Sequence, residues 1–386
     1  MPIKPFSIPY SEVAIQDLRD RLSRTRWPDA IPGSGWEYGT DMGFMRDICA
    51  YWRDRFDWKA QVGRMSELHH YRYDSSGFGL HFVHEKGTGP QPLPVLLTHG
   101  WPGSFLEFEK IIPMLTSPQR FGADPYDAFD VVVPSLPGFG YSDRPAERGF
   151  NTFRIAQLLL DLMEELGYSR FGAQGGDFGA NVSTVLALRH PERLAGIHLN
   201  YVPGSYYPHI EPGVEITPAE RAFLQSAAEW EENYGGYLHL QATQPQTLAY
   251  ALNDSPAGLA AWILEKFRGW ADCEGDLSRR FTRDELLTHA TLYWITETIH
   301  SSCRLYYEAT HAPLRFAKGD LVRVPCGIAH FPKEEPFPPR QWVERGYNIQ
   351  HWTEMPTGGH FAATEEPELL ARDIRDFFRP FRVSET

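Results

Sequence analysis

The stretch Gly-Gly-Asp-Phe-Gly at residues 175–179 lies between a strand pattern at 170–174 and a helical pattern that begins near Ala180. A sharp turn from strand to helix at this point needs small flanking residues, and it lifts the central side chain, Asp177, above the sheet. The following helix then directs its N-terminal amides toward developing negative charge. A glycine-rich turn in which Asp177 merely caps the helix is the alternative. The position after a buried strand favours a functional turn.

Short apolar runs without polar alternation surround this turn and alternate with helical patterns. Such runs are typical of strands buried on both faces of a parallel sheet. Their alternation with helices predicts right-handed crossovers, so we expect an α/β protein with a mostly parallel central sheet and helices on both faces. The strand patterns lie at 94–98, 130–134, 170–174, 194–199, 321–324 and near 347–349, and helical patterns lie at 152–166, 180–189 and 369–378.

Residues 205–315 interrupt this alternation and show helical patterns only, one of them starting with Ser255 as N-cap and Pro256 at the first helical position. A helical insertion between sheet strands is a natural lid. Residues 1–90 also look helical and polar, with Ser11 as the cap of a first helix. We therefore expect three parts: an N-terminal segment at 1–90, a core at 91–204 and 316–386, and a helical lid at 205–315.

The composition excludes several classes of protein. With 37 basic and 50 acidic residues, the net charge of −13 argues against a nucleic-acid surface and against adhesion to an anionic membrane. No apolar run reaches the length of a signal peptide or a membrane span, so we expect a soluble, cytoplasmic protein. Hydrophobic residues at 42 % supply a large core. The cysteines show no metal-ligand spacing, and core thiols are expected at Cys49, Cys273, Cys303 and Cys326.

An aspartate at the centre of the 175–179 turn predicts a particular reaction. A serine that attacked a saturated carbon would form an ether, which histidine and water cannot cleave. A carboxylate forms an ester, whose carbonyl carbon water can attack. Asp177 therefore indicates displacement at an sp³ carbon through an alkyl-enzyme ester, with epoxides and haloalkanes as the obvious electrophiles.

Partners for Asp177 stand at the expected places along the chain. His360 follows the last strand and precedes the last helix, and the order of nucleophile, acid and base fits a catalytic triad. A packed or surface histidine is the alternative among 15 histidines. The acid is Glu334 or Glu335, which spacing alone does not separate, and a solvated charge pair is the alternative reading of both. The amides of Trp101 and Phe178 are expected to form the oxyanion hole, although a plain turn would also explain the sequence around Trp101.

At these residues the sequence resembles the microsomal-type epoxide hydrolases across nearly the whole chain. The resemblance implies an α/β-hydrolase fold, in which residues 1–90 form the N-terminal meander of the family, wrapped around core and lid. Two departures from the family are expected: no counterpart of the membrane anchor of some relatives, and Phe178, where many relatives have Trp. The matching segments are Arg-Trp-Pro at 26–28, His-Gly-Trp-Pro-Gly-Ser at 99–104, Gly-Gly-Asp-Phe-Gly at 175–179, Ala-Leu-Asn-Asp-Ser-Pro-Ala-Gly-Leu at 251–259, and Gly-Gly-His-Phe-Ala-Ala at 358–363.

The resemblance also implies roles for individual residues. Asp177 would be the nucleophile and His360 the base. Glu334 would be the acid, because the family's acid precedes a Trp-Val pair by eight positions, as Glu334 precedes Trp342 here. Two lid tyrosines would bind the epoxide oxygen, and Tyr237 and Tyr306 match them. Phenols suit this task because the alkoxide released by ring opening needs a proton at neutral pH.

The expected function is hydrolysis of a bulky, apolar epoxide to a vicinal diol, without metal or cofactor. Trp101 and Phe178 are expected to line the substrate pocket, and a homodimer is expected. The nearest alternative is a haloalkane dehalogenase, which would need N–H donors around a departing halide that Phe178 lacks. A non-catalytic binding protein on the same fold is the second alternative, and the intact Asp, Glu and His set argues against it.

Overall fold

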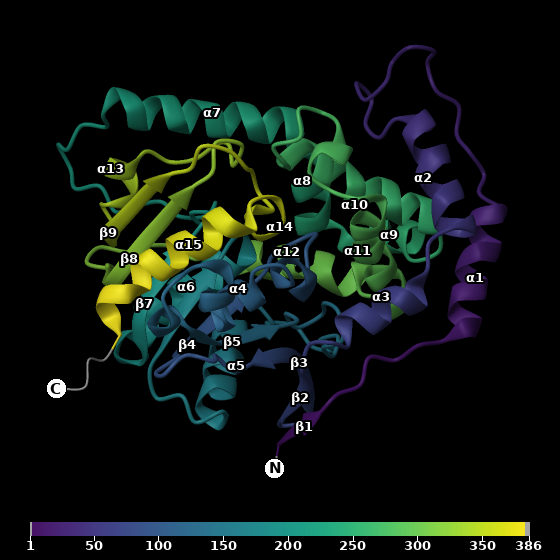
Figure 1. Ribbon diagram of the computed structural model, residues 1–386. Coiled ribbons are helices and arrows are strands. Elements are labelled where there is room, and N and C mark those ends of the chain that lie inside the picture. The colour runs from purple at the N-terminus through teal and green to yellow at the C-terminus, as the bar shows by residue number, and fades with distance from the viewer. Residues whose placement is uncertain (1, 383–386) are drawn as a thin grey trace.

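The computed structural model describes residues 2–382, which build a nine-stranded sheet in the order β1-β2-β3-β5-β4-β6-β7-β8-β9 (Figure 1). Neighbouring strands from β5 to β9 are parallel, whereas β1, β2 and β3 join the sheet antiparallel. The predicted mostly parallel sheet is therefore confirmed. Its strands are Ile3–Pro5 (β1), His70–Ser75 (β2), Phe78–Glu85 (β3), Leu93–Thr98 (β4), Phe129–Pro134 (β5), Phe171–Gly175 (β6), Leu194–Leu199 (β7), Val322–His330 (β8) and Tyr347–Glu354 (β9).

Two sequence predictions about strands were wrong in part. Residues 1–90 are not helical throughout, because β1, β2 and β3 extend the sheet there. A two-residue turn joins β2 to β3, and Ser76 and Gly77 both adopt positive φ, as such hairpins require. The strand predicted at 321–324 runs on to His330, because a register shift in β8 accommodates Pro325, which cannot donate a ladder hydrogen bond.

The predicted helix starts are confirmed by their caps. The Ser11 side chain accepts from the Ala14 amide, and the Ser255 side chain accepts from the Gly258 amide. The helices are Glu12–Ser23 (α1), Met42–Asp54 (α2), Trp58–Met65 (α3), Ile112–Thr116 (α4), Thr152–Glu165 (α5), Phe178–Arg189 (α6), Pro218–Tyr234 (α7), Gly236–Thr243 (α8), Pro245–Leu252 (α9), Pro256–Trp270 (α10), Arg283–Thr296 (α11), Ile299–His311 (α12), Arg340–Val343 (α13), Ala362–Glu365 (α14) and Pro367–Phe378 (α15).

Helices cover both faces of the sheet, as two glycines of β6 demonstrate. A Cβ on Gly172 would meet the Phe378 ring of α15, and a Cβ on Gly175 would overlap the Gly179 backbone of α6. Residues an odd number of positions apart on a strand point to opposite faces. Helices α15 and α6 therefore lie on opposite faces, and both approach the sheet closely because these positions lack side chains.

Helices α7 to α12 form the insertion between β7 and β8, and residues 205–315 contain no strand. The N-terminal helices α1 and α2 stand beside this insertion, where both contact α10, while α3 contacts α11 (Figure 1). The N-terminal segment thus joins the insertion to the sheet that it also extends. The three-part division of the chain and the function of the insertion as a lid stay predictions.

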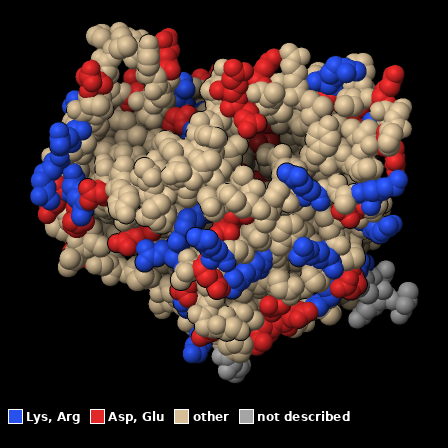
Figure 2. Space-filling model, turned by 180° about the vertical axis from the view of Figure 1, so that it is seen from behind, with Lys and Arg blue, Asp and Glu red and all other residues tan. Residues whose placement is uncertain are grey.

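Charged side chains of both signs are interspersed over the face seen in Figure 2. This pattern fits the negative net charge and differs from the single basic stripe that nucleic-acid binding requires. Among residues 2–382, no helix combines the length and the apolar composition needed to cross a membrane.

Candidate active site

The turn between β6 and α6 holds Asp177 in a strained conformation. Its φ of 48° and ψ of −124° are unusual for a residue with a side chain. The turn is possible only because its surroundings are small: a Cβ on Gly179 would overlap the carbonyl of Thr98, and a Cβ on Gly100 would overlap Asp177 itself. A strained residue persists only where packing over-determines it, and such residues cluster at functional sites.

Two backbone amides hold the Asp177 carboxylate. The Trp101 N–H donates to Oδ1 at 2.9 Å, and the Phe178 N–H at the start of α6 donates to the same carboxylate. Burial raises the pKa of Asp177, while the neighbouring His360 and these two amides counteract that increase. The two amides therefore favour negative charge at this carboxyl group, as an oxyanion hole would.

His360 lies between two carboxylates. Its Nδ1 is 2.8 Å from Glu334 Oε2, and its Nε2 is 3.9 Å from Asp177 Oδ2. Of the two candidate acids, Glu334 contacts the imidazole, whereas Glu335 Oε2 accepts the Phe337 N–H at 3.3 Å. Burial opposes protonation of the imidazole, but the charge and hydrogen bond of Glu334, with Asp177, raise the His360 pKa to about 9.

Tyr237 on α8 and Tyr306 on α12 meet above the turn. The Tyr237 ring stacks on Trp101 with a centroid distance of 5.5 Å, and the Tyr306 ring meets Phe178 edge-on at 4.8 Å. The two phenol rings are themselves 5.9 Å apart. Burial, together with the negative charge of Asp177, raises the pKa of both phenols well above the usual value, so both carry their protons at neutral pH.

The Tyr306 hydroxyl is buried, and no group among residues 2–382 meets hydrogen-bond geometry with it, although the Tyr237 phenol is its polar neighbour. Buried hydroxyl groups are almost always hydrogen-bonded, so an exception beside a strained carboxylate marks a place for a ligand. The oxygen of a small molecule between the two tyrosines would satisfy this donor. Trp101, Phe178, Tyr237 and Tyr306 give this place aromatic walls.

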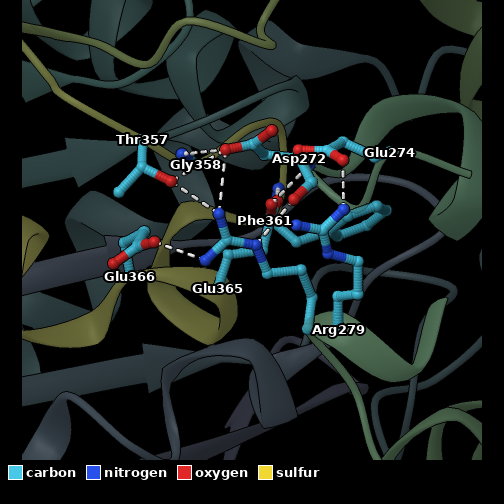
Figure 3. A network of polar contacts seen from close by, with 9 residues as sticks. Asp272, Glu274, Arg279, Thr357, Gly358, Phe361, Glu365 and Glu366 are labelled. Atoms are coloured by element: carbon cyan, nitrogen blue, oxygen red, sulfur yellow. Dashed lines mark hydrogen bonds and ion pairs between the residues drawn. The ribbon is translucent and has the colours of Figure 1, made fainter. Parts of the chain in front are cut away.

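A polar network outside this group anchors the loop that carries His360 (Figure 3). Asp272 Oδ2 accepts from Arg280, from the Thr357 hydroxyl and from the Gly358 amide at 2.8, 2.8 and 3.0 Å. Glu365 continues the network, because it accepts the amides of Asp272 and Phe361 at 2.7 and 2.9 Å. The loop is thereby joined to the segment that follows α10 in the helical insertion.

Residues that the sequence did not single out also reach this site. Trp270, the last residue of α10, accepts the His360 N–H at 3.0 Å and packs its ring against the imidazole at 5.0 Å. Glu107 is a half-buried residue whose carboxyl pKa rises to about 8 because the surrounding protein desolvates it, and it contributes to the raised pKa of His360. Gly103 makes room for it, since a Cβ there would overlap the Glu107 carboxylate. Glu107 could not be recognised from the sequence, because a single acidic residue within an aromatic stretch matches no motif.

Similarity to known proteins agrees with this geometry. The family model described as the epoxide hydrolase N terminus matches residues 3–108, and that of the alpha/beta hydrolase fold matches residues 94–262. Epoxide hydrolase 1 of Sus scrofa is 38% identical over 405 residues, covering 97% of this chain and 88% of that protein. The chain belongs to the epoxide hydrolase family. The α/β-hydrolase fold and the resemblance to microsomal-type epoxide hydrolases are thereby confirmed.

Solved structures of epoxide hydrolases superpose on nearly the whole chain. Juvenile hormone epoxide hydrolase of the silkworm Bombyx mori matches with a TM-score of 0.84 at 31% identity, covering 98% of this chain and 94% of that chain. Epoxide hydrolase of Aspergillus niger matches with a TM-score of 0.86 at 26% identity, covering 99% of this chain and 97% of that chain. The N-terminal segment and the helical insertion of this epoxide hydrolase are thus included in the common fold.

Among residues 2–382 of this epoxide hydrolase, no group of three or more His, Cys, Asp or Glu side chains has the arrangement of a metal site.

Proposed function

We propose that the protein hydrolyses epoxides to vicinal diols through an ester on Asp177. The observation that carries this proposal is the half-buried Asp177 carboxylate on a strained turn, held by two amides and 3.9 Å from the imidazole of His360. A carboxylate in this place can form and then release an alkyl ester, which a serine in the same place could not do.

In the proposed first step, the epoxide oxygen lies between the hydroxyls of Tyr237 and Tyr306. Oδ1 of Asp177 is engaged by the Trp101 amide, so Oδ2 is the oxygen free to attack a ring carbon. The C–O bond of the ring breaks, and its electron pair goes to the epoxide oxygen. That oxygen takes a proton from a phenol, which gives a hydroxyalkyl ester of Asp177.

In the proposed second step, neutral His360 takes a proton from water while the water oxygen attacks Cγ of the ester. Negative charge develops on Oδ1, where the amides of Trp101 and Phe178 stabilise it, a contribution of about 3 kcal/mol per donor. The bond from Cγ to the ester oxygen then breaks, and the leaving oxygen takes the proton held by His360, which frees the diol. The second proton of the attacking water passes to the phenolate, which restores both the Asp177 carboxylate and the phenol. Glu334 orients the imidazole and stabilises its protonated form.

Two features favour this reaction over the alternatives. A haloalkane dehalogenase needs N–H donors beside the leaving halide, whereas Phe178 contributes no side-chain donor and the facing tyrosines suit an oxygen that must gain a proton. A non-catalytic binding protein would gain nothing from a strained nucleophile and an imidazole with an orienting carboxylate. Glu334 and Asp177 are both within 4 Å of that imidazole.

The substrate is proposed to be bulky and apolar, because aromatic rings surround the place between Asp177 and the two tyrosines. The relatives named above act, by their names, on epoxides and, for the Bombyx mori protein, on the epoxide of juvenile hormone. The helical insertion at 205–315 is proposed as the lid over this place, and the N-terminal segment at 1–90 as the meander that joins lid to core. Pairing of two chains and a cytoplasmic location stay predictions.

The experiment is product analysis with styrene oxide and a bulkier apolar epoxide, alongside a panel of haloalkanes. We expect diol from an epoxide, no chloride from the haloalkanes, and no turnover by Asp177→Asn. Chloride release without diol would establish the dehalogenase instead. Failure of any epoxide to label Asp177 in the wild-type protein would favour a binding protein.

A further inference from the structure

We propose that Lys266 is a positioning residue whose fixed positive charge strengthens Tyr237 as a hydrogen-bond donor to the epoxide oxygen. The inference rests on the proposed function and adds to it a residue outside the Asp, His, Glu and Tyr set. It follows from where one buried lysine places its ammonium group.

Lys266 lies in α10, and only 7% of its surface is exposed. Lysines are almost never buried to this degree without a specific partner. Its Nζ stands over the Tyr237 ring, 4.5 Å from the centroid, which is within the range of a cation–π contact. Among the charged groups of residues 2–382 it pairs with its chain neighbour Glu265. The ammonium therefore lies between the Tyr237 ring and the partly exposed Glu265 carboxylate, and is not surrounded by solvent.

The sequence of α10 builds this contact. Trp262, Lys266 and Trp270 stand four residues apart and so share one face of the helix. The two tryptophan rings lie 5.7 and 5.9 Å from Lys266 Nζ and, with Tyr237, surround it with aromatic faces. Trp262 is fixed in turn by a hydrogen bond of 2.9 Å from its Nε1 to Gln241. The ammonium is thus held in place before any ligand binds.

A fixed cation beside the ring matters because of the charges that Tyr237 otherwise faces. Burial, followed by the negative charge of Asp177 and lesser effects of Tyr201 and Glu334, disfavours any loss of the Tyr237 proton. Ring opening shifts that proton toward the alkoxide and leaves negative charge on the phenol. The Lys266 charge stabilises this developing phenolate, and it does so more strongly among aromatic rings than it would in water. The positive charge of Lys266 thereby counteracts the negative charge of Asp177, which disfavours loss of the Tyr237 proton.

The test measures ester formation and ester hydrolysis separately, in single turnovers with styrene oxide. We expect Lys266→Met to slow ester formation by about tenfold, within the strength of a desolvated cation–π contact, and to leave hydrolysis unchanged. Lys266→Arg keeps the charge and should recover most of the rate. Lys86→Met is the matched control, because Lys86 stands over the Tyr168 ring at 4.8 Å and away from the site.

A double-mutant cycle with Tyr237→Phe decides whether the charge acts through the phenol. In that background, which retains Tyr306, the loss of Lys266 should change ester formation by less than about twofold. An equal effect in both backgrounds would overturn the inference, as would an equal slowing of both half-reactions, which would indicate a displaced α10. Unchanged ester formation in Lys266→Met would overturn this inference alone, whereas a wild-type protein without any ester would overturn the proposed function as well.

Discussion

The Nε2 atom of His360 lies 3.9 Å from Oδ2 of Asp177, too far for a hydrogen bond. The imidazole is instead hydrogen-bonded through Nδ1 to Glu334 at 2.8 Å. Asp177 Oδ2 is thus not committed to the imidazole and is available to attack a carbon atom. After Asp177 has become an ester, Nε2 of His360 still faces its carbonyl carbon. It is therefore placed to activate the water that attacks this carbon.

Replacement of His360 by Gln should divide the two half-reactions. Ester formation needs the Asp177 carboxylate and the tyrosines, whereas ester hydrolysis needs a base, so hydrolysis should slow by about 10³-fold and the ester should accumulate. Intact-mass spectrometry after mixing with styrene oxide would detect the added mass. A variant that lost diol formation without any adduct would contradict the assigned role of His360.

Glu334 and Glu335 offer a matched pair of variants. Glu334→Gln should slow ester hydrolysis by about 10²-fold or more, because the imidazole loses its orienting carboxylate. Glu335→Gln should change the rate by less than about threefold, since its side chain contacts the Phe337 amide and not His360. Equal effects on the rate of diol formation would show that the acid acts through local folding alone.

The hydrolysis step should quicken as pH rises. The His360 pKa of about 9 in the free protein is supported by two anionic neighbours, Glu334 and Asp177. Ester formation removes the Asp177 charge, so the pKa of the imidazole in the intermediate should fall below about 9. Because only neutral imidazole accepts a proton, the rate should increase through that pKa and then level off. Rapid-quench measurement of ester decay between about pH 6 and about pH 9.5 tests this, and a rate that fell over the range would exclude His360 as the base.

Two neighbouring arginines, Arg279 and Arg280, test the network that anchors the His360 loop. Arg280 is 20% exposed and binds Asp272, whereas Arg279 is 51% exposed and pairs with exposed Glu274. Arg280→Met should slow ester hydrolysis by about tenfold and destabilise the fold by about 2 kcal/mol, because Asp272 and Glu366 lose a charged donor. Arg279→Met should leave ester decay and the thermal midpoint almost unchanged. An equal loss in both variants would contradict a role of this network in holding the His360 loop.

The sequence predicts those parts of the site that depend on local chemistry. The turn at 175–179 needs small residues within a few positions of Asp177, so the motif is visible without a structure. The caps at Ser11 and Ser255 are equally local, and both were confirmed. The choice between Glu334 and Glu335 depended on the resemblance to a family, because both follow the same strand. Their contacts distinguish them only in three dimensions.

Features built from distant residues were not predictable in this way. Strands β2 and β3 were missed because their Ser-Gly turn is a weak signal within a segment rich in helical patterns. Arg280 meets Thr357 and Glu366 across 77 and 86 positions of the chain. From the sequence alone, Lys266 would be taken for an exposed helix residue. Its contact with Tyr237 depends on the packing of α8 against its ammonium group. Such contacts arise from tertiary packing and leave no periodic pattern in the sequence.

A single turnover in ¹⁸O-labelled water, with enzyme in excess over styrene oxide and mass analysis of the peptide that contains Asp177, tests the central claim most directly. Water is proposed to attack Cγ of the ester, so we predict diol together with ¹⁸O in the Asp177 carboxylate. The Asp177→Asn variant provides the control, and its peptide should stay unlabelled. Diol without label in Asp177 would mean that water attacks the epoxide directly, and it would contradict the ester route.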